Sequence, residues 1–110
     1  MNIFEQLERL STVIAQRAAN ADPESSYVAK LLSKGASRAG KKVGEEAVEV
    51  AIAAAGADNE EVISESADLL FHLLVLWQAR GVTADQVMAE LRRREGVSGI
   101  AEKKGRKKTA

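Results

Sequence analysis

One stretch of the sequence decides the fold: Val43-Gly44-Glu45-Glu46-Ala47-Val48-Glu49-Val50-Ala51-Ile52-Ala53-Ala54-Ala55, in which three glutamates are the only charged side chains. At about 100° per residue the three glutamates fall within one narrow arc of a helix, and small or apolar residues cover the rest. A helix that is apolar nearly all round is usually buried against its neighbours. We therefore expect a helix over about residues 42–55 that lies inside a helical bundle.

A second segment, residues 58–80, repeats this pattern. From Ala67 to Trp77 only Asp68 and His72 are polar. One face of the expected helix carries, at helical spacing, Glu61, Glu65, Asp68 and His72. Antiparallel packing of the two helices would point both acidic faces at a shared cleft.

The rest of the chain also has helical periodicity. Residues 3–19 read as an amphipathic helix, Asp22 and Pro23 as the start of a helix that ends at Gly35, and Thr83 as the cap of a last helix. Residues 35–44 are expected to be a loop. Alternating strand patterns are absent, so we predict an all-α bundle of about four to five helices completed by dimerisation. We expect one domain at residues 1–96 and a basic, flexible tail at 97–110.

Composition excludes several classes of protein. The formal net charge is zero, which gives no general case for a nucleic-acid or membrane-surface binder. The absence of cysteine excludes disulfides, thiolate metal sites and a cysteine nucleophile. No signal-peptide pattern and no unbroken apolar run of ~18 residues occur. We expect a soluble, cytoplasmic protein without a nucleic-acid or membrane partner.

The charges are segregated along the chain. Between residues 45 and 68 every charged side chain is acidic. Between residues 30 and 42 every one is basic, and these are Lys30, Lys34, Arg38, Lys41 and Lys42. Solvated helix faces usually mix signs, because like charges one turn apart destabilise a helix. Carboxylates without basic partners suit Mg²⁺, and an acid-free basic stretch suits phosphate.

We therefore predict a magnesium site whose ligands and catalytic groups are Glu45, Glu46, Glu49, Glu65 and Asp68. The five basic residues of positions 30–42 are the predicted substrate-binding groups. The structural alternative is that both sets are merely solvated helix faces. His72, the only histidine, is either a hydrogen-bonded core residue or a group that orients a metal ligand. Trp77 is most simply a core residue.

The acidic residues also carry a resemblance. Glu45-Glu46-Ala47-Val48-Glu49 followed by Glu65-Ser66-Ala67-Asp68 resembles the EExxE…ExxD signature of the MazG-type all-α nucleotide pyrophosphohydrolases. Residues 26–32, 42–46 and 67–74 are similar to the phosphoribosyl-ATP pyrophosphatase family of histidine biosynthesis, and the similarity extends over about residues 3–95. It implies Mg²⁺-dependent hydrolysis of phosphoribosyl-ATP to phosphoribosyl-AMP and pyrophosphate. It also implies a cytoplasmic helical homodimer with sites near the subunit interface.

Two other functions remain open from the sequence. A house-cleaning pyrophosphohydrolase of (deoxy)nucleoside triphosphates would use the same metal motif with a different pocket for base and sugar. A non-catalytic helical interaction module would need no metal and would tolerate loss of the glutamates. The second alternative leaves the two base-free acidic faces unexplained.

Overall fold

The computed structural model of the chain describes residues 1–20 and 22–96, and these form helices and connecting turns without a strand. The helices are α1 (Ile3–Asn20), α2 (Tyr27–Ser33), α3 (Ala36–Ala55), α4 (Asn59–Arg80) and α5 (Ala84–Arg94). The predicted all-α architecture is confirmed for this part of the chain. The tail predicted at 97–110 lies outside the described residues.

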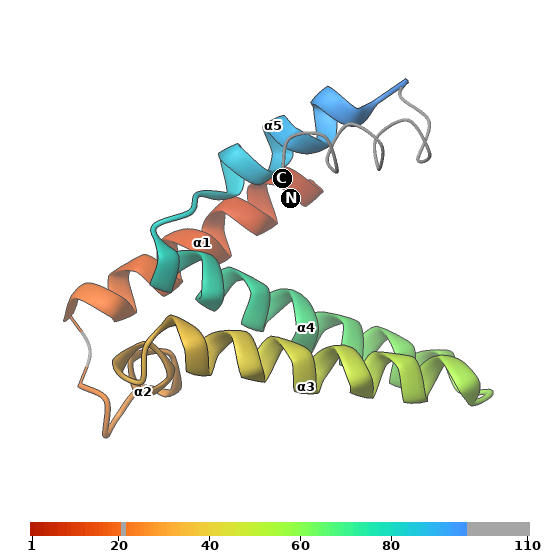
Figure 1. The fold of residues 1–110 in the computed structure, drawn as a ribbon, viewed down its shortest axis with the longest axis horizontal. Helices are drawn as coiled ribbons and strands as arrows, with labels where there is room; N and C mark the ends of the chain where they lie inside the picture. Colours follow the sequence, from red (N-terminus) through yellow and green to blue (C-terminus); the bar gives the residue numbers. More distant parts are fainter. Residues whose placement is uncertain (21, 97–110) are drawn as a thin grey trace.

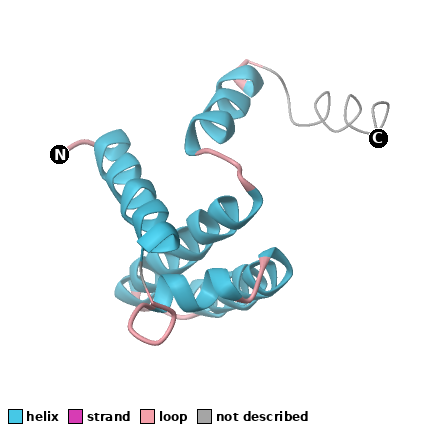
Figure 2. Cartoon of the chain, turned by 90° about the vertical axis from the view of Figure 1, so that its left-hand side faces the viewer, coloured by secondary structure: helices cyan, strands magenta, loops and turns pink. Residues whose placement is uncertain are grey.

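The dominant feature of the fold is an antiparallel hairpin of α3 and α4 (Figure 1). The two helices pack side by side along their length, as the sequence pattern predicted. Helices α1 and α2 pack against one end of this hairpin, and α5 extends from α4 to lie against α1 (Figures 1 and 2). The other end of the hairpin, with the α3–α4 turn, projects away from the remaining helices.

The hydrophobic core lies where α1 and α2 meet the second half of α4. Its buried residues are Ile14, Val28, Leu31, Leu74 and Val75. Trp77 packs against this cluster, as predicted for a core residue. The core therefore anchors α2, a helix of only seven residues, against α4.

The prediction that Asp22 and Pro23 start a helix is wrong. Residues 23–25 form a turn in which Asp22 Oδ1 accepts a hydrogen bond from the Glu24 N–H at 3.0 Å. Ser26 is the actual cap, because its Oγ accepts from the Ala29 N–H at 3.2 Å. The aspartate side chain stabilises the turn, and the serine side chain then starts α2.

The loop predicted over residues 35–44 is also wrong, because α3 begins at Ala36. Gly35, at φ 87°, separates α2 from α3 and marks the start of the longer helix. The glycines at 40 and 44 lie inside α3 in spite of a cost of about 1 kcal/mol each relative to alanine. Burial of Ala39, which is 2% exposed, holds this first part of α3 in the fold.

The predicted ends of α4 and α5 are confirmed. Asp58 Oδ1 accepts from the Glu60 N–H at 2.9 Å, and Gly81 ends α4 in the left-handed conformation at φ 70°. Thr83 and Gln86 form the predicted capping box at the start of α5. These signals are read correctly because each depends on side chains within a few residues of the helix end.

The hairpin exposes large apolar side chains. Val48 and Ile52 on α3 are 57% and 62% exposed, and Ile63 and Leu70 on α4 are 68% and 53% exposed. The 42–55 helix, which was expected to be buried against its neighbours, is therefore buried over only part of its surface within this chain. We refer to Val48, Ile52, Ile63 and Leu70 as the exposed apolar residues of the hairpin.

Helix α4 is, by length and composition alone, long and apolar enough to cross a membrane. Core helices of soluble proteins pass the same test. Glu65 and Asp68 stand in the middle part of this helix, where ionised side chains would be costly in hydrocarbon. We therefore interpret α4 as a bundle helix.

Candidate metal and phosphate site

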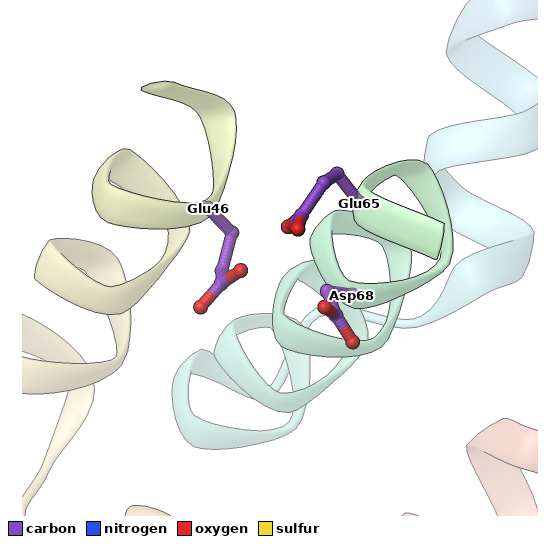
Figure 3. A group of neighbouring side chains, drawn as sticks. All are labelled: Glu46, Glu65 and Asp68. Carbon is purple, nitrogen blue, oxygen red and sulfur yellow. The ribbon is translucent and has the colours of Figure 1, made fainter. Parts of the chain in front are cut away.

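Three carboxylates meet between the two helices of the hairpin. Glu46 projects from α3 toward Glu65 and Asp68 of α4 (Figure 3). One carboxylate oxygen from each residue lies within 4.8 Å of the other two. We call Glu46, Glu65 and Asp68 the carboxylate triad. Glu65 and Asp68 are one turn apart on α4, and the packing of α3 against α4 brings Glu46 next to them.

The triad is partly enclosed and electrostatically strained. The Glu46 side chain is only 13% exposed, and Glu65 is half-buried. Partial burial, and then the negative charge of Asp68 and of Glu49, raises the pKa of Glu65 above its usual value. A raised pKa means that the surroundings disfavour the charged form of Glu65, and a cation placed among these oxygens would offset that cost.

The other two predicted acidic residues lie next to the triad but outside it. Glu49 is exposed, yet it is near enough for its charge to act on the Glu65 carboxylate. The Glu45 side chain is 53% exposed and lines a neighbouring pocket. The structure thus brings three of the five predicted acidic side chains into one group.

That pocket, of about 230 Å³, lies between α2 and α3 and is strongly basic. All five predicted substrate-binding residues line it: Lys30 from α2, Lys34 at the C-terminal cap of α2, and Arg38, Lys41 and Lys42 from α3. We call it the basic pocket. Ammonium and guanidinium groups that converge in this way match the charge and donor needs of phosphoryl oxygens.

Lys42 joins the basic pocket to the carboxylate triad. Its Nζ lies 3.4 Å from Glu46 Oε1 and 3.6 Å from Glu45 Oε2. The contact with Glu46 is the main reason why the pKa of Lys42 is raised. The Lys42 side chain therefore lies where the anionic and cationic halves of the site meet.

Sequence reasoning did not select Tyr27 for the site. Its hydroxyl lies 3.0 Å from His72 Nε2, and its side chain lines the basic pocket. The available signal was its position one helical turn before Lys30 on α2. His72 is buried and hydrogen-bonded, and it also lies one turn after Asp68.

The triad satisfies the chemical requirements of a divalent cation. Mg²⁺ prefers carboxylate oxygens at about 2.1 Å, which places two ligand atoms up to about 4.2 Å apart. The 4.8 Å limit among the triad oxygens is close to this separation, so small rotamer changes would complete a site. The exposure of Asp68 leaves room for water and substrate oxygens as further ligands.

Comparison with known proteins identifies the family. The sequence profile described as phosphoribosyl-ATP pyrophosphohydrolase matches residues 7–95. The chain belongs to this family. It is 60% identical over 103 residues to the phosphoribosyl-ATP pyrophosphatase of Erythrobacter litoralis, an alignment that covers 94% of this chain and 95% of the relative. It is 55% identical over 100 residues to that of Cereibacter sphaeroides, with 91% and 96% covered.

The phosphoribosyl-ATP pyrophosphohydrolase family is the one that the acidic motifs resemble, so the family expected from the sequence is confirmed. Membership also makes the chain a hydrolase, as predicted. The matched region, residues 7–95, contains both the carboxylate triad and the basic pocket.

Proposed function

We propose that this chain hydrolyses the α–β phosphoanhydride of phosphoribosyl-ATP, in a Mg²⁺-dependent reaction of histidine biosynthesis that gives phosphoribosyl-AMP and pyrophosphate. The observation that carries the proposal is the carboxylate triad directly beside a basic pocket, in a chain of this family. A triphosphate substrate and three to five carboxylates repel one another, and cations are the means of holding them together. We place the reaction in the cytoplasm, where small-molecule biosynthesis takes place.

The acidic half of the site holds the metal. Glu46, Glu65 and Asp68 are the proposed ligands, and Glu45 and Glu49 complete the acidic surroundings. Mg²⁺ held by these residues would supply Lewis-acid stabilisation of the phosphoanhydride and would make water a better nucleophile. A carboxylate of this set that does not contact the metal is positioned to accept the proton of the attacking water.

The basic half of the site holds the substrate phosphates. The cations of α2 and α3 face one pocket and neutralise the charge that spreads over the phosphoryl oxygens. Lys42 lies where this pocket meets Glu46, so it is the cation closest to the proposed metal ligands. In this arrangement the α–β phosphoanhydride would lie between the carboxylate triad, which binds the metal, and the basic pocket, which binds the phosphates.

We also propose that the chain works as a homodimer. The exposed apolar residues of the hairpin lie on the two helices that carry the triad, and single chains rarely leave such side chains uncovered on neighbouring helices. A second copy of this chain would present the same apolar residues and is the simplest partner to cover them. Covering the hairpin would also exclude water from the neighbourhood of the carboxylates.

The test of the activity is pyrophosphate release from a panel of substrates, with and without Mg²⁺. We expect release from phosphoribosyl-ATP to exceed release from ATP, dATP and dCTP, and to stop when the metal is chelated. Equal or faster release from the simple triphosphates would favour the house-cleaning alternative. No release from any member of the panel would favour the interaction module.

The test of the homodimer is its mass in solution by sedimentation equilibrium. Ile52→Glu places a charge among the exposed apolar residues of the hairpin and should shift the protein toward the monomer. Leu91→Glu is the matched control, because Leu91 is 53% exposed on α5, apart from the exposed apolar residues of the hairpin. A wild-type protein that is monomeric at all concentrations contradicts the proposal.

A further inference from the structure

A buried hydrogen bond joins the basic pocket to the helix of the carboxylate triad. His72 Nδ1 lies 2.7 Å from the backbone carbonyl oxygen of Asp68, which can only accept, so Nδ1 carries the proton. In the neutral ring Nε2 is then an acceptor, and the Tyr27 hydroxyl donates to it at 3.0 Å. The bond thus has a defined direction, from α2 to α4.

This bond is exceptional among the described residues. Leaving aside Arg93 and Arg94, every other side-chain hydrogen bond or ion pair within residues 1–20 and 22–96 joins groups two to four positions apart. The Tyr27–His72 bond spans 45 positions and connects two helices. In the described part of the chain, the other contacts between helices are therefore mainly apolar.

His72 is also, in the same described ranges, the one polar or charged residue that is buried, at 6% exposure. An imidazole in an apolar core costs free energy through lost hydration, even when both nitrogens have partners. An apolar residue of similar size would avoid this cost. Stability alone therefore does not explain why a hydrogen-bonded histidine occupies this position.

The Tyr27–His72 bond connects the two halves of the site: Tyr27 lies at the basic pocket, and His72 lies beside the carboxylate triad. Tyr27 lines the basic pocket one turn before Lys30, on the short helix whose C-terminal cap residue is Lys34. Its ring stacks on Phe71 of α4, with centroids 6.2 Å apart. His72 is bonded to the backbone at Asp68, one turn from a triad carboxylate. A rotation of α2 about its axis would swing both lysines, and this bond opposes that rotation.

We propose that Tyr27 and His72 are positioning residues, whose hydrogen bond sets Lys30 and Lys34 at the distance from the triad that bound phosphates require. The inference rests on the proposed function, because it assigns phosphate binding to the basic pocket. Apolar packing of Val28 and Leu31 keeps α2 against the core, but such contacts are non-directional. A hydrogen bond is directional, so it can select one rotation of the helix among several that pack equally well.

The first test is Tyr27→Phe, which removes the hydroxyl and keeps the ring on Phe71. The probe is inorganic pyrophosphate in metal-free buffer, with its Kd measured by calorimetry well below the melting temperature. We expect the Kd, and the KM for phosphoribosyl-ATP, to rise about fivefold with kcat changed by less than about twofold, the size of one lost hydrogen bond that affects substrate binding only. Ile14→Val, a mild core change on α1, is the control for stability and should leave both constants unchanged.

The second test uses a pair of changes at His72. Glutamine can place an acceptor oxygen where Nε2 lies, whereas the shorter asparagine can replace only Nδ1. We expect His72→Gln to keep the pyrophosphate Kd within about twofold of the wild type and His72→Asn to match Tyr27→Phe. In the His72→Asn background, Tyr27→Phe should add no further loss, because the partner is already gone.

Two results would overturn the inference. One is a pyrophosphate Kd for Tyr27→Phe equal to that of the wild type. The other is independent, multiplying losses in the Tyr27→Phe, His72→Asn double variant. Failure of the proposed function looks different: wild-type protein would release no pyrophosphate from phosphoribosyl-ATP, whatever the Kd values of the variants.

Discussion

Two glutamates on consecutive helices, Glu65 and Glu90, have pKa values shifted in opposite directions. Glu90 on α5 lies between two arginines, with its carboxylate 2.7 Å from Arg93 Nη2 and 3.0 Å from Arg94 Nε. These hydrogen bonds lower the pKa of Glu90 to about 2. Glu65 on α4 faces other carboxylates, and partial burial with their charge raises its pKa.

The difference separates a structural carboxylate from one that requires a ligand. Glu90 has cationic partners on its own helix, so its charge is compensated within the folded chain. Glu65, Glu46 and Asp68 face one another, and Lys42 contacts the triad only through Glu46, at 3.4 Å. Folding therefore leaves net negative charge between α3 and α4, which a divalent cation would compensate.

The largest effect is expected from Glu65→Gln, which removes a charge and a metal ligand but keeps the shape of the side chain. Activity should fall by more than about 100-fold, because loss of groups that merely support metal ligands already costs about 10–100-fold. The metal-free melting temperature should stay equal or rise, since a like-charge repulsion is removed. Steady-state kinetics and thermal unfolding without Mg²⁺ check both points.

Glu61→Gln is the matched control for this change, because Glu61 is exposed and lies one turn earlier on α4, outside the triad. Its activity should stay near the wild-type value. If Glu65→Gln lost activity together with a large fall in metal-free stability, Glu65 would be structural, and the contrast with Glu90 would disappear.

A smaller effect is expected from Lys34→Gln in the basic pocket. A hydrogen bond to a charged group contributes about 1.5–3 kcal/mol. Because neighbouring cations in the pocket also bind the phosphates, we expect the lower end of this range, with KM raised about tenfold and little change in kcat. Added salt should weaken substrate binding in the wild type more than in the variant. Arg9→Gln, an exposed change on α1, should alter neither constant. An unchanged KM for Lys34→Gln would mean that this lysine is only a solvated side chain.

The smallest effect is expected in the pH dependence of stability. Because the folded pKa of Glu90 is lowered, its contribution is present above the unfolded pKa near 4.5 and is lost as the pH falls toward 2. Glu65 has the opposite sign: ionisation destabilises the metal-free protein, so Glu65→Gln should gain stability relative to the wild type above pH 4.5.

Thermal unfolding from pH 7 to pH 2 measures both signs. Glu90→Gln should be slightly less stable than the wild type at pH 7 and equal to it near pH 2. The difference should be small, because Glu90 and Arg93 are largely solvated. Equal behaviour of the Glu65 and Glu90 variants would contradict the comparison.

Much of this arrangement could be predicted from the sequence. The acidic faces of α3 and α4, their antiparallel packing and the caps at Asp58 and Thr83 depend on helical spacing and on side chains close in sequence. The choice of Lys30, Lys34, Arg38, Lys41 and Lys42 depended on a run of one charge sign. These signals depend on residues close together in the sequence, and the structure agrees with them.

The rest depends on contacts between distant residues. Whether Glu49 joins Glu46 in the triad is decided by the rotation of α3 against α4, which spacing within one helix does not fix. The bond between Tyr27 and His72 spans 45 positions, so no sequence window contains both partners. The start of α3 at Ala36 is not predicted from the sequence, because two glycines argue against a helix and the burial of Ala39 depends on contacts with the rest of the fold.

The most direct test of the central claim is the melting temperature of the wild type and of Glu65→Gln as Mg²⁺ is added. If the triad is a metal site, the wild-type melting temperature should rise by about 5 °C or more once Mg²⁺ exceeds its Kd tenfold, because the ion binds only the folded protein. The Glu65→Gln protein should show little or no rise. An equal shift in the two proteins, or no shift in the wild type at millimolar Mg²⁺, would contradict the account.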